Sequence, residues 1–150
     1  MKILKMFLPA LFVISVILNC SCFAENTNYP ENLWKGLIGE AASEFTDFGE
    51  LSGYKSMYAT ACVYRNRIRL KMSLGCVALK RPDLDELVKK SGKYEKTAKE
   101  IIKKVFIENG PDITNGATHY ENVEKFGFPY WSKSMKTTTV IGSHTFFVEK

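Results

Sequence analysis

Two glutamates one helical turn apart are the first residues in this sequence that could do chemistry. Glu40 and Glu44 lie beside the apolar positions Ala41, Ala42 and Phe45, so a helix would place both carboxyls at the edge of its buried face. Burial at such an edge removes water from a carboxyl and favours its protonated form, and a like charge one turn away acts in the same direction. The pair therefore predicts either a general acid or, as the commoner outcome, two solvated glutamates.

A denser group of polar and aromatic residues follows in the last third of the chain. His119, Tyr120 and Asn122 lie within four residues, and Trp131 comes shortly after them. Aromatic rings beside amide and hydroxyl groups suit a sugar-binding groove, in which rings stack on apolar sugar faces and polar groups contact hydroxyls. An aromatic core beneath a long loop would give the same pattern. His144, in the last apolar segment, is expected to be a structural histidine.

The hydrophobic pattern predicts that helices position these groups. Apolar residues recur at helical spacing over residues 31–45, 54–70 and 94–109, a short helix is expected at 82–90, and turn-forming residues gather at 46–53. Residues 112–136 indicate an ordered loop with short strands. Residues 137–148 predict a β-hairpin around Gly142-Ser143. The predicted fold class is α+β and mainly helical, a bundle of about four helices with a small late β-hairpin.

Length and composition favour one globular domain behind an export signal. The 150 residues are 45% hydrophobic and 25% charged, which excludes collagen-like, low-complexity and wholly disordered chains and fits one domain. Residues 1–24 combine two lysines, an apolar run at 6–18 and a small residue at the expected cleavage point, as a secretory signal peptide does. The apolar run is shorter than the roughly 20 residues of a membrane-spanning helix. A retained anchor, or a lipoprotein signal ending at Cys20 or Cys22, is the alternative.

Cleavage after residue 24 predicts a mature domain of residues 25–150, exported to the periplasm, the cell wall or the extracellular space. It retains 19 lysines and arginines against 16 acids, a net charge of +3. That excess suits an anionic partner such as a cell-wall polymer, a membrane surface or a nucleic acid, without choosing among them. The domain keeps Cys62 and Cys76, which are expected to form a disulfide in an oxidising compartment, with two buried free thiols as the alternative.

Taken in chain order, these segments resemble the SleB-type family of cell-wall hydrolases, the spore-cortex-lytic enzymes and their relatives. The matching residues cover nearly all of the mature domain: Gly39-Glu40-Ala41 with Glu44, Asn66-Arg67, Gly75-Cys76-Val77, Thr114-Asn115-Gly116-Ala117-Thr118-His119-Tyr120 with Asn122, Pro129 with Trp131, and Ile141-Gly142-Ser143-His144-Thr145-Phe146. The chain departs from the family pattern in the longer stretch at 46–53 and at Asn115, where glycine is common. It also departs at Tyr64-Arg65, where a more apolar pair is typical.

The resemblance implies a lysozyme-like fold and a lytic transglycosylase that cleaves the MurNAc–GlcNAc bond of peptidoglycan. Glu40 would be its acid/base, with no metal and no cofactor. Glu44 is expected to assist Glu40. The partner would be peptidoglycan and not nucleic acid, and the protein is expected to act as a monomer. The expected substrate-binding residues of the groove are His119, Tyr120, Asn122 and Trp131.

Three other functions stay open from the residues alone. A zinc-dependent peptidoglycan amidase could use His119, Glu121 and His144 as ligands, although no spacing of the HExxH kind supports it. A secreted ribonuclease could use the two histidines as an acid/base pair and the basic stretch at residues 65–71 to hold phosphates. A wall-binding protein without activity would keep the same groove.

Overall fold

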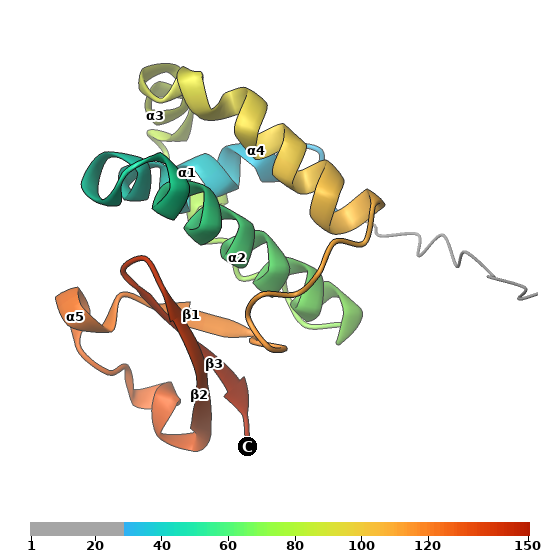
Figure 1. The fold of residues 1–150 in the computed structure, drawn as a ribbon, viewed down its shortest axis with the longest axis vertical. Helices are drawn as coiled ribbons and strands as arrows, with labels where there is room; N and C mark the ends of the chain where they lie inside the picture. The colour runs from blue at the N-terminus through green and yellow to red at the C-terminus, as the bar shows by residue number, and fades with distance from the viewer. Residues whose placement is uncertain (1–28) are drawn as a thin grey trace, which may run out of the picture.

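The computed structural model of the protein describes residues 29–150, so the predicted signal peptide at residues 1–24 lies outside the described residues. The described chain is mainly helical with a small antiparallel sheet, which confirms the predicted α+β class. Figure 1 shows helix α2 between the other long helices on one side and the sheet on the other. Within residues 29–150, no helix has both the length and the apolar character needed to cross a membrane.

The two longest helices are separated by a single residue. Helix α1 spans Leu33–Phe48 and helix α2 spans Glu50–Arg69, with Gly49 between them. Gly49 has a φ of +83°, a conformation that glycine adopts readily. Gly53 lies so close to Phe45 that an added Cβ would collide with the ring. The predicted turn-rich interruption between these helices is therefore wrong, because one glycine redirects the chain and the other lets the helices pack closely.

The remaining helices cover α1 and complete the core. Helix α3 spans Leu84–Lys90, and helix α4 spans Glu95–Ile102 and continues as a π-helical turn at Lys103–Ile107. Short 3-10 turns at Ala78–Lys80 and Gly92–Tyr94 connect them. Each fully buried large apolar side chain stabilises the fold by about 1.5–3 kcal/mol. The core contains Leu33, Leu37, Ile38, Met57, Ile101 and Val105 among others.

A buried arginine supports the end of the last of these helices. Arg65, on α2, is 2% exposed, and its guanidinium donates hydrogen bonds to the carbonyl oxygens of Val105 (3.0 Å) and Gly110 (2.6 Å). The last carbonyls of a helix lack partners within the helix. The Arg65 guanidinium supplies hydrogen-bond donors to these carbonyls, which explains why a charged side chain is buried at this position. Regular α geometry ends at Ile102, earlier than the predicted helix over residues 94–109.

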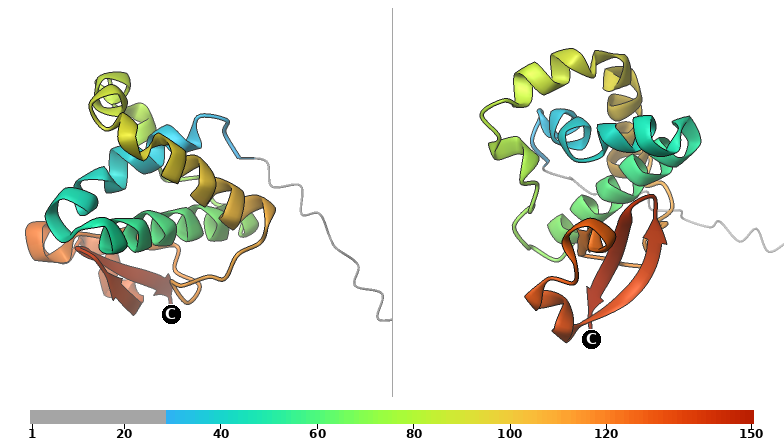
Figure 2. Two further views of the ribbon diagram at one scale, coloured as in Figure 1. Left: turned by 45° about the horizontal axis from the view of Figure 1, so that its top comes forward. Right: turned by 90° about the vertical axis from the view of Figure 1, so that its left-hand side faces the viewer.

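Three strands form an antiparallel sheet in the order β1-β3-β2. Their bounds are β1 at His119–Glu121, β2 at Met135–Ile141 and β3 at His144–Glu149, with helix α5 (Val123–Phe126) and a 3-10 turn (Tyr130–Ser134) between β1 and β2 along the chain. Strands β2 and β3 are the predicted hairpin around Gly142-Ser143. Figure 2 shows the tip of this hairpin reaching the helices near the start of α2.

The strand register separates two candidate site residues. Directly paired residues share a face of a sheet. Tyr120 pairs with Phe146, which is buried against α2, so this face points toward the helices. His119 pairs with Phe147 on the opposite face, which Trp131 covers. Two adjacent residues of β1 therefore point to different sides of the sheet.

The C-terminal end of α2 fixes the loop that leads into β1. The Asn66 amide donates to the Asp112 carboxylate (2.8 Å), and the Arg67 guanidinium donates to the Thr118 carbonyl (2.8 Å). Burial opposes the charge of Asp112, but hydrogen bonds from Asn66 and from the loop itself outweigh it and lower the pKa of this carboxyl. Asn66-Arg67 thereby place β1 relative to α2.

Cys62 and Cys76 are both buried free thiols, so the predicted disulfide is not formed. The Cys62 thiol faces the Pro111 carbonyl at 3.7 Å. Cys76 packs against Gly36, where an added Cβ would come within 2.5 Å of its sulfur, and against Tyr64. Cys62 and Tyr64 point to different sides of α2, because two positions along a helix correspond to a turn of about 200°. The two thiols therefore lie in separate parts of the core.

We expect Cys62 and Cys76 to remain reduced and slow to react in the native protein. Burial raises the pKa of Cys62 to about 11 and also raises the pKa of Cys76, which disfavours the reactive thiolate. Alkylation in denaturant without reductant, followed by peptide mapping, should find each cysteine alkylated in its own peptide. A sample reduced beforehand serves as the control. A peptide cross-linked through Cys62 and Cys76 would contradict the structure.

Candidate active site

A cleft of about 900 Å³ lies where the sheet meets the helices, and we call it the Glu40 cleft. Its walls come from α1, α2, the segment between α2 and α3, β1, α5 and the hairpin turn. Five of the predicted site residues line it together: Glu40, Glu44, His119, Tyr120 and Asn122. Charges of both signs border the same space, from Asp47, Glu121, Glu124, Arg67, Arg81 and Lys125.

Glu40 borders the cleft with one carboxylate oxygen held by the backbone. Its Oε1 accepts a hydrogen bond from the Ala78 N–H at 2.9 Å. This approach depends on the preceding Gly39, where an added Cβ would come within 2.6 Å of the Ala78 Cβ. The side chain is half-buried, and the Tyr120 hydroxyl hydrogen-bonds to it. Glu40 is therefore fixed in orientation and still open to the cleft.

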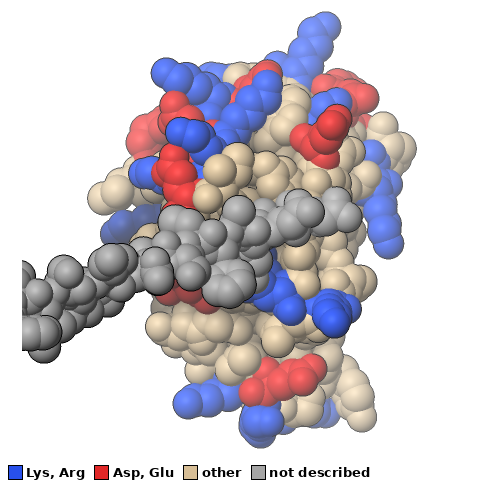
Figure 3. All heavy atoms as spheres, turned by 90° about the vertical axis from the view of Figure 1, so that its right-hand side faces the viewer, with Lys and Arg blue, Asp and Glu red and all other residues tan. Residues whose placement is uncertain are grey.

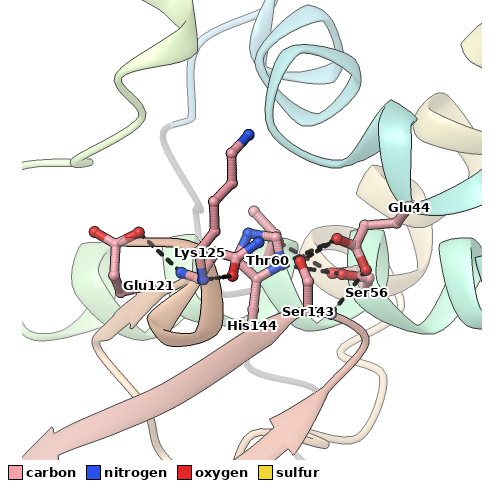
Figure 4. Close-up of polar contacts among 8 residues, drawn as sticks. Glu44, Ser56, Thr60, Glu121, Lys125, Ser143 and His144 are labelled. Atoms are coloured by element: carbon pink, nitrogen blue, oxygen red, sulfur yellow. Dashed lines mark hydrogen bonds and ion pairs between the residues drawn. The ribbon is translucent and has the colours of Figure 1, made fainter. Parts of the chain in front are cut away.

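Glu44 lies in a different environment one turn further along α1. It is 3% exposed, and its carboxylate accepts hydrogen bonds from the Ser143 N–H (3.0 Å) and from the Ser143 hydroxyl. Figure 4 shows Glu44 reaching from α1 to Ser143 in the hairpin turn, with His144 beside them. Gly142 has a φ of +59° and no space for a Cβ, because Glu44 occupies it. Neither glutamate is thus the solvated surface residue that the sequence left open as an alternative.

Tyr120 and His144 fill the space between the two glutamates. Their rings pack edge to face with centroids 5.3 Å apart, and His144 Nδ1 lies 3.7 Å from Glu44 Oε1. Burial lowers the pKa of His144, although the charges of Glu44 and Glu40 oppose this, so the neutral imidazole is favoured near pH 7. Burial and the nearby Glu40 carboxylate raise the pKa of Tyr120 well above its usual range, which keeps its hydroxyl protonated.

The other predicted groove residues are placed less uniformly. Asn122 borders the cleft, and its side-chain oxygen caps α5 by accepting from the Lys125 N–H at 2.9 Å. His119 reaches the cleft edge from the other face of the sheet and packs against Trp131, with ring centroids 5.2 Å apart. Trp131 also packs against Phe147, at 5.3 Å, and lies outside the cleft lining. Trp131 is therefore placed apart from the other predicted groove residues, against Phe147 on the outer face of the sheet.

The geometry does not support a joint role for the two histidines. His119 and His144 project from opposite faces of the sheet, since His119 shares a face with Phe147 and His144 packs against Tyr120. Across residues 29–150, no three His, Cys, Asp or Glu side chains converge as metal ligands would. His119, Glu121 and His144 all border the Glu40 cleft, but they do not converge on one metal position, and the two histidines reach the cleft from opposite faces of the sheet.

The basic stretch at residues 65–71 also differs from a phosphate-binding surface. Arg65 is buried, and Arg67 donates to the carbonyls of Ser73 (2.7 Å) and Thr118 (2.8 Å). Figure 3 shows one face of the molecule on which positive and negative side chains are interspersed over the helices. Where the described residues are visible, this mixture differs from the continuous basic surface that a nucleic acid favours.

Sequence reasoning missed two side chains that shape the site. The sequence assigns Ser143 to the hairpin turn and to a matching segment but gives it no role, and its contact with Glu44 joins residues 99 positions apart. The Tyr64 hydroxyl lies 3.0 Å from that of Tyr120. The sequence offers one sign of this role: Tyr64 stands where SleB-type hydrolases typically have an apolar residue.

Comparisons with known proteins add no relative. No family model, curated protein or solved structure matches this chain. The likeness to SleB-type hydrolases stays a prediction from the residues, and the function has to be argued from the site itself.

We expect Gly142→Ala to destabilise the protein more than Gly116→Ala. Both glycines have positive φ, +59° and +81°, so alanine costs about 1–2 kcal/mol at either position. Only at position 142 would the new Cβ displace the Glu44 carboxylate, which adds about 1.5–3 kcal/mol for lost hydrogen bonds to a charged group. Urea denaturation of both variants measures the difference. Equal losses would show that the contact between Glu44 and the hairpin turn contributes little.

We expect the free energy of unfolding to decrease as the pH falls below about 6.5, the ordinary pKa of histidine. Burial lowers the pKa values of His144 and His119 in the folded protein, so the unfolded chain binds protons more readily. The stability conferred by neutral histidines is therefore lost as the pH falls through their folded-state pKa values. Urea denaturation between pH 7.5 and about 5.5 should give a shallower dependence for His144→Gln. An unchanged slope in this variant would contradict the role of His144.

Proposed function

We propose that the protein is an exported enzyme that cleaves the glycan strands of peptidoglycan. It acts as a lytic transglycosylase on the bond between N-acetylmuramic acid and N-acetylglucosamine, with Glu40 as the acid/base. The observation that carries the proposal is the position of Glu40, a half-buried carboxyl that borders a 900 Å³ cleft beside the Tyr120 hydroxyl. Concave sites with a few convergent polar groups and a functional carboxyl are typical of enzymes.

The reaction needs one group that both donates and accepts a proton. Protonated Glu40 donates to the glycosidic oxygen as the bond from C1 of N-acetylmuramic acid breaks. The resulting carboxylate then takes the proton of that sugar's 6-hydroxyl, whose oxygen closes onto C1 to give a 1,6-anhydro product. Because the nucleophile belongs to the substrate, intramolecular proximity replaces an activated water. General acid–base transfer of this kind contributes about 10²–10⁴-fold to the rate.

The two neighbouring glutamates fit different parts of this proposal. Glu44 is covered and hydrogen-bonded to Ser143, so it supports the hairpin turn and not the sugar. A hydrolytic glycosidase uses a second carboxylate as nucleophile or base. Asp47, Glu121 and Glu124 also line the cleft, so the chemical form of the product distinguishes a transglycosylase from a hydrolase.

We expect Glu40→Gln to reduce peptidoglycan cleavage by about 10²-fold or more, because the amide cannot donate the proton. The change is nearly isosteric, so thermal unfolding and binding to sacculi should stay close to wild type. Mass spectrometry of digested peptidoglycan measures the products, with Glu100→Gln on the exposed surface of α4 as the control. The wild type should yield 1,6-anhydro ends in the presence of a chelator as well as in its absence.

Other products would contradict parts of this proposal. Full activity in a folded Glu40→Gln protein would exclude Glu40 as the acid/base. Reducing ends would indicate a hydrolase, and released stem peptides an amidase. Binding to sacculi without any soluble fragment would indicate a wall-binding protein.

A further inference from the structure

A tyrosine hydroxyl lies in the core directly behind the candidate site. Tyr64, on α2, is fully buried, at 0% exposure, belongs to the main hydrophobic core and also lines the Glu40 cleft. A buried hydroxyl left without a partner costs about 1–3 kcal/mol. Phenylalanine would fill this position without that cost, so the hydroxyl is expected to have a role.

The Tyr64 hydroxyl connects the core to Glu40. It lies 3.0 Å from the Tyr120 hydroxyl, and Tyr120 hydrogen-bonds to the Glu40 carboxyl. On its inner side Tyr64 contacts the Cys76 thiol. Four groups from separate segments are thus linked by neighbouring contacts, from Cys76 to Tyr64, from Tyr64 to Tyr120 and from Tyr120 to Glu40.

The chemistry of these groups fixes the direction of the hydrogen bonds. A carboxylate only accepts, and each tyrosine has one proton to donate. When Glu40 is ionised, the Tyr120 hydroxyl therefore donates its hydrogen bond to Glu40. The Tyr120 oxygen then accepts a hydrogen bond from the Tyr64 hydroxyl. The Tyr64 oxygen is then left to accept from the weak S–H donor of Cys76. Burial raises the pKa values of Tyr64, Tyr120 and Cys76, so all three keep their protons near neutral pH.

We propose that Tyr64 is a positioning residue that acts on Glu40 through Tyr120. By donating to the Tyr120 oxygen, Tyr64 orients the Tyr120 proton toward Glu40 and stabilises the ionised form of that carboxyl, since hydrogen bonds to the charged form favour it. Its effect on catalysis rests on the proposed function, whereas its effect on the titration of Glu40 does not.

Other titratable groups also face Glu40, and a test of Tyr64 has to leave these residues unchanged. They lie on several elements packed around it: Glu44 on α1, Cys76 and Arg81 between α2 and α3, and His144 on β3. Tyr58→Phe is a matched control, because Tyr58 is a mostly buried tyrosine of the same helix. Its hydroxyl donates to the Pro111 carbonyl at 3.1 Å.

The test is a ¹³C NMR titration of glutamate carboxyl signals in the full chain, with the Glu40 signal assigned from Glu40→Gln. In Tyr64→Phe the titration midpoint of Glu40 should move to higher pH by about half a unit or more. Tyr58→Phe should leave it at the wild-type value. Tyr120→Phe, which removes the hydroxyl next to Glu40, should move it in the same direction and also serves if Tyr64→Phe fails to fold.

The double variant decides whether Tyr64 acts through Tyr120. Adding Tyr64→Phe to Tyr120→Phe should move the Glu40 midpoint no further, because the connecting hydroxyl is already gone. A further shift in the double variant, or an unmoved midpoint in Tyr64→Phe, would overturn the proposal.

Activity measurements separate this proposal from the proposed function. On peptidoglycan, the loss of rate at high pH follows deprotonation of the general acid. In Tyr64→Phe this loss should therefore move to higher pH together with the NMR midpoint. An active protein whose rate profile stays in place while the midpoint moves would contradict a role of Tyr64 in catalysis. A wild type without activity, but with the expected NMR shifts, would contradict only the proposed function.

Discussion

The buried carboxylate of Glu44 is the contact on which the arrangement of the site depends. A buried charge is tolerated only when hydrogen bonds replace its lost water, and the hairpin turn supplies them through Ser143. This contact joins α1 to the hairpin across 99 positions of sequence. Strand β3 follows the turn directly and is the central strand of the sheet, so it determines the position of β1. Tyr120, on β1, is thereby held beside Glu40.

Environment, and not position along the helix, separates the roles of the two glutamates. Glu40 and Glu44 project from one face of α1 and border the same cleft. The turn covers Glu44 and uses its oxygens, whereas Glu40 receives a backbone donor from Ala78 and stays half-buried. Ser143 occupies the oxygens of Glu44, so Glu40 is the carboxyl of the pair that stays open to the cleft.

The sequence predicted those features that local periodicity encodes. The helical stripes around Glu40 and Ile101 and the hairpin at Gly142-Ser143 follow from spacings of a few residues, and the structure contains them. The sequence predicts a turn over residues 46–53, because turn-forming residues gather there. The structure changes direction at Gly49 alone, since one residue with positive φ is enough to separate the two helices.

The features of the site that differ from the sequence-based expectation depend on contacts between distant residues. A disulfide between Cys62 and Cys76 was plausible from their separation, but the direction in which each thiol leaves its segment decides against it. Trp131 lies outside the Glu40 cleft because the strand register places Phe147, its partner, on the outer face of the sheet. The role of Ser143 likewise depends on a distant contact, because the hairpin turn that contains it packs against Glu44 on α1.

Helix α2 unites the core and the candidate site, because consecutive residues on a helix point about 100° apart. Tyr64 points to Tyr120, Arg65 to the carbonyls that end the π-helical turn, Asn66 to Asp112 and Arg67 to the backbone before β1. Four successive side chains therefore tie the stretch from Val105 to Tyr120 to one helix. Tyr64 and Arg65 are adjacent but act on different surroundings, since Tyr64 places a hydroxyl beside Tyr120 and Arg65 donates to a carbonyl of the π-helical turn. A chemical role for Glu40 would thus be adjusted from within the core, by a residue whose packing the fold already requires.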